Sequence, residues 1–128
     1  MAFRIPVWFL RVLWTTGIIV FLLISVIPLG RTPLSDVESG DKIAHFGVFF
    51  ILALFPVITR AVSKRMVFLL LLLVALGSET LQIFVPYRSA EATDIAADIL
   101  GLFAGLGSCF VLRHCLYLLI QSRDSKRL

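Results

Sequence analysis

The fold class is decided by residues Met66–Val85, which read MVFLLLLLVALGSETLQIFV and contain one charged side chain, Glu79. An α-helix of this length rises about 30 Å, which matches the hydrocarbon core of a bilayer. Backbone N–H and C=O groups in lipid must be satisfied within the segment, and a helix does this. The stretch therefore predicts a membrane-spanning helix.

The rest of the chain has the same apolar character. Of its 128 residues, 59% are hydrophobic and 16% are charged, whereas a soluble domain carries about a quarter charged residues. The first apolar stretch is longer than the apolar region of a cleaved signal peptide, so we expect a retained helix. We predict an all-α fold, an integral membrane four-helix bundle forming one domain over residues 1–128, with spans at about 7–28, 42–59, 66–85 and 95–120.

Basic residues are unevenly distributed between the two ends of the predicted spans. Nine lie on the side of the chain termini and the 60–65 loop, and three lie on the other side. Because the cytoplasmic ends of membrane helices are enriched in Lys and Arg, we predict that both termini are cytoplasmic. These residues flank apolar spans and form no continuous patch, so we expect no nucleic-acid partner. The three on the outer side are Arg31, Lys42 and Arg88.

Acidic residues show the opposite distribution, with seven of the eight predicted on the outer half. Acidic residues contribute little to orientation, so their gathering requires another explanation. The seven are Asp36, Glu38, Asp41, Glu79, Glu91, Asp94 and Asp98.

The fourth span begins with Asp94 and Asp98, which share one helix face at i,i+4 spacing. The same face continues through Gly101 and Gly105, a GxxxG pattern that lets another helix approach closely. We therefore expect this face, with its carboxylates, to point into the bundle. Dimerisation through the glycines is the open alternative, so a homodimer is a candidate assembly.

The second and third spans bring further polar residues to the same level. Asp41 and His45 share a face at i,i+4, and Glu79 and Gln82 share one at i,i+3. Helix rise places His45, Glu79 and Asp98 in one layer about 4–9 Å below the outer boundary. Since ionisable groups inside membrane spans are expensive and usually functional, we interpret the layer as a site.

Some of these residues also have a structural interpretation. Asp41 and Asp94 can cap the helices that they open. Gln82 can hydrogen-bond between helices. Glu79 lies too deep in its span for capping, which favours a functional role.

Two motifs combine these residues. The first is Asp41–Phe46, DKIAHF, followed by Phe49; the second is Glu79–Gln82, ETLQ, followed by Pro86, Arg88-Ser89, Asp94, Gly101 and Gly105. Together they resemble the VanZ-like family of bacterial membrane proteins over about residues 41–105, while the first span matches only as generic membrane sequence. The chain departs from the family at Asp98, where the usual residue is Asn, and this adds a potential negative charge.

The resemblance implies a multi-pass protein of the bacterial inner membrane that acts in the cell envelope. The family is named after a protein that confers low-level resistance to the glycopeptide teicoplanin, so an effect on glycopeptide sensitivity is implied. Our first hypothesis is a site for a lipid-linked or anionic envelope molecule, whose phosphate or carboxylate Arg31, Lys42 and Arg88 would contact. The expected partners are membrane lipids, a lipid-linked envelope precursor or a glycopeptide. The expected ligand-binding residues are Asp41, Lys42, His45, Glu79, Gln82, Arg88, Asp94 and Asp98.

Two other functions remain open. In a membrane enzyme acting on an envelope lipid, His45 and Glu79 would serve as acid and base, or would hold a divalent metal with Asp94 and Asp98. No metalloprotease or serine-hydrolase motif supports this, and we expect no cofactor and no resident metal. A proton-coupled carrier is the third hypothesis, although the acidic residues do not continue into the cytoplasmic half.

Overall fold

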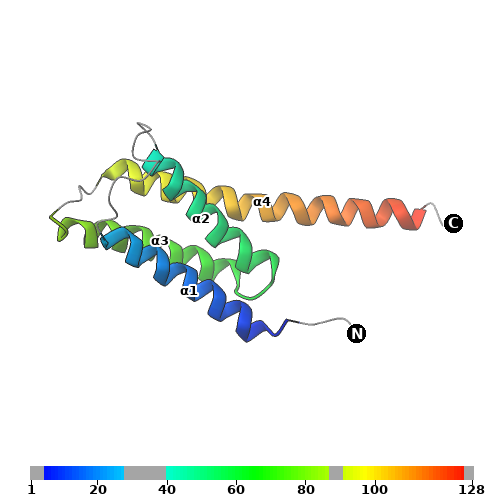
Figure 1. Cartoon of the computed structure of the whole chain (residues 1–128). Helices are drawn as coiled ribbons and strands as arrows, with labels where there is room; N and C mark the ends of the chain where they lie inside the picture. Colours follow the sequence, from blue (N-terminus) through cyan, green and yellow to red (C-terminus); the bar gives the residue numbers. More distant parts are fainter. Residues whose placement is uncertain (1–4, 28–39, 87–90, 126–128) are drawn as a thin grey trace.

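The computed structural model describes residues 5–27, 40–86 and 91–125, and α-helix is the one regular secondary structure in these residues. All four helices contain a segment long and apolar enough to cross a membrane, which confirms the predicted all-α class and the four spans. Figure 1 shows α1, α2 and α3 close together, with the first half of α4 running along α2. They are α1 (Val7–Val26), α2 (Gly40–Ile58), α3 (Lys64–Ile83) and α4 (Ala92–Ser125).

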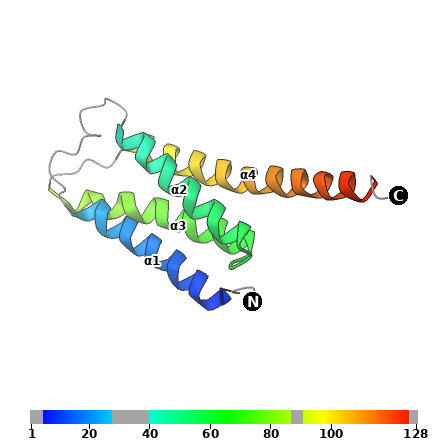
Figure 2. The ribbon, with the colours of Figure 1, turned by 45° about the vertical axis from the view of Figure 1, so that its right-hand side comes forward.

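The helix boundaries differ from the predicted spans by a few residues. Helix α3 begins at Lys64, because the Ser63 side chain accepts a hydrogen bond from the Met66 N–H at 3.4 Å and caps the helix. Helix α4 begins at Ala92, three residues before the predicted span, so that Asp94 lies in its first turn. With 34 residues, α4 also extends well past the other helices (Figure 1, Figure 2).

Two glycines let α4 lie directly against α2. A Cβ atom on Gly101 would clash with the backbone carbonyl of Phe46. One on Gly105 would lie 2.5 Å from the Phe50 carbonyl oxygen and 2.9 Å from Ala53 Cβ. The expectation that this glycine face points into the bundle is therefore confirmed, and the face is used within the chain. A homodimer would have to use another surface.

Helix α1 is attached to α2 through a carbonyl that proline has freed. Pro56 lies inside α2 and has no N–H, so the Leu52 carbonyl four residues earlier lacks its usual intrahelical donor. The Trp14 Nε1–H donates to this carbonyl at 2.8 Å, with both groups buried. The pairing satisfies two polar groups that would otherwise be costly in a membrane interior.

Two arginines satisfy backbone carbonyls at the end of α2. Arg11 donates through Nε to the Ala61 carbonyl at 2.9 Å, and Arg113 donates through Nη2 to the Val57 carbonyl at 2.8 Å. Val57 lies in the last turn of α2, where carbonyls have no donor four residues on in the helix, and Ala61 lies in the loop that follows. This end of the bundle is therefore tied together by cations on α1 and α4.

The predicted orientation can be checked by cysteine labelling. A cysteine replacing Ser63, between α2 and α3, should not react with a membrane-impermeant maleimide in intact cells, because the basic loop beside it is expected in the cytoplasm. Cysteines replacing Ser35 and Ala90, which lie outside the described residues, should react. Cys109 and Cys115 are first changed to alanine so that only the new thiol reports. Labelling of Ser63→Cys in intact cells would reverse the orientation.

Candidate functional site

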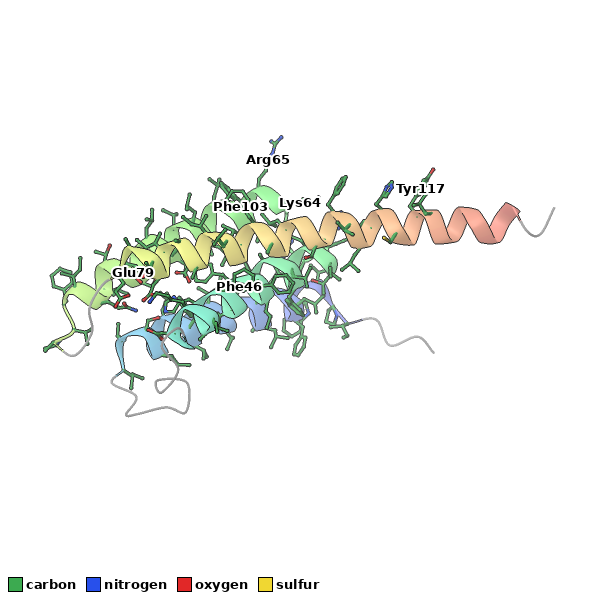
Figure 3. The ribbon with its side chains drawn as sticks, turned by 90° about the horizontal axis from the view of Figure 1, so that it is seen from above. Phe46, Lys64, Arg65, Glu79, Phe103 and Tyr117 are labelled. Carbon is green, nitrogen blue, oxygen red and sulfur yellow. The ribbon has the colours of Figure 1, made fainter. Side chains whose placement is uncertain are left out.

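The polar residues of the bundle gather at one end, which we name the polar end: α1 and α3 finish there, and α2 and α4 begin there (Figure 1). Figure 3 shows Glu79 at this end, while Lys64, Arg65 and Tyr117 lie towards the other. This is the end of the bundle at which we predicted the acidic layer from the sequence.

The centre of the polar end is a hydrogen-bonded pair between α2 and α4. His45 Nδ1 lies 2.9 Å from Asp98 Oδ1, and the two side chains are 7% and 0% exposed. The close contact at Gly101, one turn after Asp98, brings the helices near enough for these two side chains to meet. The ring of Phe21 packs edge-on against the His45 ring at a centroid distance of 5.6 Å. The imidazole is therefore held on two sides.

A second group of charges lies nearer the surface. Lys42 Nζ lies 3.1 Å from Glu91 Oε2 and 3.9 Å from Asp94 Oδ1. Lys42 and Glu91 are both substantially exposed, so this ion pair contributes little to stability. From the sequence we expected Lys42 to contact an anionic ligand, whereas in this structure its ammonium group lies beside two carboxylates.

Glu79 connects α3 to the beginning of α4. Its Oε2 accepts a hydrogen bond at 3.1 Å from the N–H of Glu91, the residue before α4. The expectation that Glu79 lies too deep for capping is therefore wrong. It considered only the helix that carries Glu79, whereas α4 begins three residues earlier than predicted and brings its own N-terminus to this carboxylate.

Four buried polar atoms at the polar end have no hydrogen-bond partner among the described residues. Native proteins contain few such atoms, and each one costs about 1–3 kcal/mol relative to a satisfied group. Their concentration at one end of a small bundle makes the residues that carry them candidates for binding a ligand. The atoms are Glu79 Oε1, Gln82 Nε2, Asp94 Oδ1 and Asp98 Oδ2.

A cavity of about 230 Å³ lies between α1 and α2 and is lined by His45, the hydrogen-bond partner of Asp98. The α1 wall consists of Gly17, Val20, Phe21, Ile24 and Ser25, and the α2 wall of Asp41, Ala44, His45 and Val48. The Ser25 hydroxyl is engaged with the Phe21 carbonyl of its own helix at 2.9 Å. Asp41 and His45 are therefore the side chains that give the apolar cavity its ionisable groups.

Most of the predicted site residues lie together at the polar end. Three of them, Asp41, His45 and Asp94, each offer a ligand atom within 4.8 Å of the others. Gln82 is buried one turn after Glu79 on α3, and its Nε2 has no hydrogen-bond partner within residues 5–27, 40–86 and 91–125. Arg88 and Arg31 lie outside the described residues.

The sequence interpretation missed Glu91 and the α1 wall of the cavity. Glu91 precedes the span predicted from residue 95, so it was counted only among the acidic residues. The sequence carries no clear signal for the α1 wall, because α1 is apolar around most of its circumference and its buried face is apparent only from the structure.

Four apolar helices with a buried polar cluster at one end define a small multi-pass membrane protein. The chain belongs to the VanZ/LLP1 family, whose family model matches residues 3–113. This match includes α1, so the resemblance is wider than residues 41–105. No solved structure matches the chain.

A eukaryotic protein is similar to this chain. An uncharacterized protein of Schizosaccharomyces pombe is 39% identical over 90 residues, which cover 66% of this chain and 56% of the relative. The chain thus spans about half the length of that relative. Because a yeast has a protein of this kind, similarity alone does not assign the chain to a bacterial inner membrane.

Proposed function

We propose that the chain binds the anionic headgroup of a lipid or lipid-linked envelope molecule at the polar end. The observation that carries the proposal is the cavity between α1 and α2, where an apolar wall leads to Asp41 and His45. Its volume of about 230 Å³ is below the roughly 300–1,000 Å³ of pockets that enclose a whole small molecule. A site of this size suits one part of an amphiphile, whose remainder stays in the bilayer.

The polar neighbours of the cavity support a headgroup rather than an acyl chain at its ionisable side. His45 and Asp98 form a buried pair there, and Asp94 Oδ1 and Asp98 Oδ2 have no hydrogen-bond partner in the described part of the chain. Lys42, next to the cavity residue Asp41 in sequence, is exposed enough to exchange Glu91 for a phosphate. With the predicted orientation, Arg31 and Arg88 would lie on the same outer side and add positive charge.

A place in the bacterial inner membrane and an effect on glycopeptide sensitivity extend this proposal. Both rest on the origin of the family name rather than on a contact in the molecule. An occupied or altered lipid-linked precursor in the outer leaflet would connect the site to a glycopeptide, because such antibiotics act on envelope precursors.

A second function, a lipid-directed enzyme, is favoured by one observation. The carboxylate of Asp98 orients the imidazole of His45, an arrangement that suits a general base. The expected acid–base partner Glu79 is instead hydrogen-bonded to the backbone of Glu91. An enzyme would therefore use His45 with Asp98, and Glu79 would position α4.

Filling the cavity tests the binding proposal. In Ala44→Phe the new ring should occupy the space between α1 and α2, so anionic lipid retained by the purified chain should fall at least about tenfold, which corresponds to about 1.4 kcal/mol. The probe is phosphatidylglycerol, added to the chain in detergent and counted by native mass spectrometry.

Ile43→Phe is the matched control. Ile43 precedes Ala44 on the same helix, is 61% exposed and does not line the cavity, so this ring should enter lipid without loss of binding. Thermal unfolding verifies that both variants fold. If folded Ala44→Phe retains phosphatidylglycerol as well as Ile43→Phe does, the cavity is not the binding site.

A further inference from the structure

The charge balance of the polar end is unfavourable for an anion on its own. Five carboxyl groups gather there among the described residues, against one lysine and one histidine. Like charges brought together at low dielectric repel strongly, so an anionic headgroup needs a cation between it and these groups. The five are Asp41, Glu79, Glu91, Asp94 and Asp98.

Three side chains are arranged as a metal site. Asp41 and His45 lie one turn apart on α2, and Asp94 lies in the first turn of α4. Their ligand atoms all lie within 4.8 Å of one another. Metal–ligand bonds of about 2.1 Å place neighbouring ligand atoms about 3–4 Å apart, so a small rotation of these side chains closes the site.

The hydrogen bond to Asp98 prepares His45 for coordination. Asp98 Oδ1 occupies His45 Nδ1 at 2.9 Å, which leaves Nε2 as the nitrogen for a metal. A carboxylate that holds the other nitrogen of a metal-bound histidine is a recurrent arrangement, because it fixes the ring and its tautomer. Asp98 thus acts as a positioning residue.

An independent observation at Asp94 also indicates a cation. Asp94 is 4% exposed, and its Oδ1 has no hydrogen-bond partner among the described residues. Lys42 Nζ lies 3.9 Å from this oxygen, which is beyond hydrogen-bonding distance. Carboxylates buried to this extent are normally paired closely or coordinate a metal. The cavity lined by Asp41 and His45 supplies the room for a cation and for a ligand bound to it.

We propose that Asp41, His45 and Asp94 bind a divalent cation, Mn²⁺ or Zn²⁺, whose open coordination positions accept phosphate oxygens of the headgroup. One imidazole and two carboxylates suit these two metals. The inference departs from the sequence expectation of no metal. The binding of the headgroup phosphate to this cation, which we call the bridging step, rests on the proposed function. The metal site itself can be tested without a lipid ligand.

Metal binding is measured first, on the full chain in nanodiscs of phosphatidylcholine after chelator treatment. Free Mn²⁺ is followed by electron paramagnetic resonance during titration, and one tight site per chain is expected. Asp41→Asn should weaken binding at least about 100-fold through loss of a ligand. Asp98→Asn should weaken it about 10–100-fold, because a neutral amide oxygen still accepts from His45 but no longer raises the basicity of the ring as a carboxylate does. Since Asp41 is exposed, its variant should fold.

Two variants separate a specific site from general attraction to acidic groups. Glu91→Gln also removes a carboxyl group from the polar end, yet Glu91 is not among the three ligands, so binding should weaken less than about threefold. Lys42→Gln should strengthen binding, because it removes the cation nearest to Asp94 Oδ1. Equal losses in Asp41→Asn and Glu91→Gln, or no tight site in the unmodified chain, would overturn the metal site.

The bridging step is measured separately with phosphatidylglycerol. Chelation should reduce its retention at least about tenfold, and Mn²⁺ should restore it in the unmodified chain but not in Asp41→Asn. Retention of phosphatidylglycerol without any tight Mn²⁺ site would refute this inference and leave the proposed function standing. A tight Mn²⁺ site without phosphatidylglycerol binding would support the metal site and refute the headgroup proposal.

Discussion

Gly105→Leu is expected to disrupt the packing of α4 against α2. The first added carbon alone would lie 2.5 Å from the Phe50 carbonyl oxygen and 2.9 Å from Ala53 Cβ, and a backbone carbonyl inside a helix cannot move aside. Overpacking in cores costs about 1–3 kcal/mol when side chains can adjust, so we expect a loss above about 3 kcal/mol here. Unfolding of the purified chain in mixed micelles, followed by circular dichroism, measures this loss.

Gly107→Leu is the matched control, because a Cβ atom on Gly107 would meet nothing within 4 Å. It makes the same substitution two residues later on the same helix and should leave stability nearly unchanged. If Gly105→Leu and Gly107→Leu unfold alike, α4 does not pack on α2 through this face. The close packing of the two helices would then also no longer explain why Asp98 meets His45.

The four spans could be predicted because the bilayer imposes a length and an apolar character that a single sequence displays directly. The inward face of α4 could also be predicted, since Gly101 and Gly105 have one helical spacing and a physical reason to face another helix. Both predictions depend on properties of one helix at a time.

Partners across helices could not be predicted in this way. Spacing associates Asp41 with His45 and Glu79 with Gln82 within their helices, but the observed hydrogen bonds join His45 to Asp98 and Glu79 to the Glu91 backbone. Such pairs depend on the relative shift and rotation of two helices, which side-chain packing along the whole contact determines. Hydropathy also placed the start of α4 three residues too late, so Glu91 was not recognised as the residue directly before the helix.

The pair of His45 and Asp98 is expected to show strong energetic coupling. In His45→Gln, the fully buried Asp98 loses the imidazole whose Nδ1 lies 2.9 Å from its Oδ1, and breaking a buried pair from one side costs about 3–5 kcal/mol. Asp98→Asn keeps an oxygen that can accept from His45 and should cost less. In the double variant, two neutral amides face each other, so part of the loss should be recovered and the coupling should exceed about 1 kcal/mol.

The same variants determine whether the pair serves function as well as stability. Phosphatidylglycerol retention is compared at a temperature where every variant remains folded, with Glu79→Gln included because it removes a charge from the same end and can still accept from Glu91. If these residues form one site, His45→Gln and the double variant should lose retention to a similar extent, since residues that act as a unit are not additive. In the unfolding measurements, a double variant whose loss of stability equals the sum of the two single losses would show that His45 and Asp98 act independently. Full retention by folded His45→Gln and Glu79→Gln would leave these residues a structural role only.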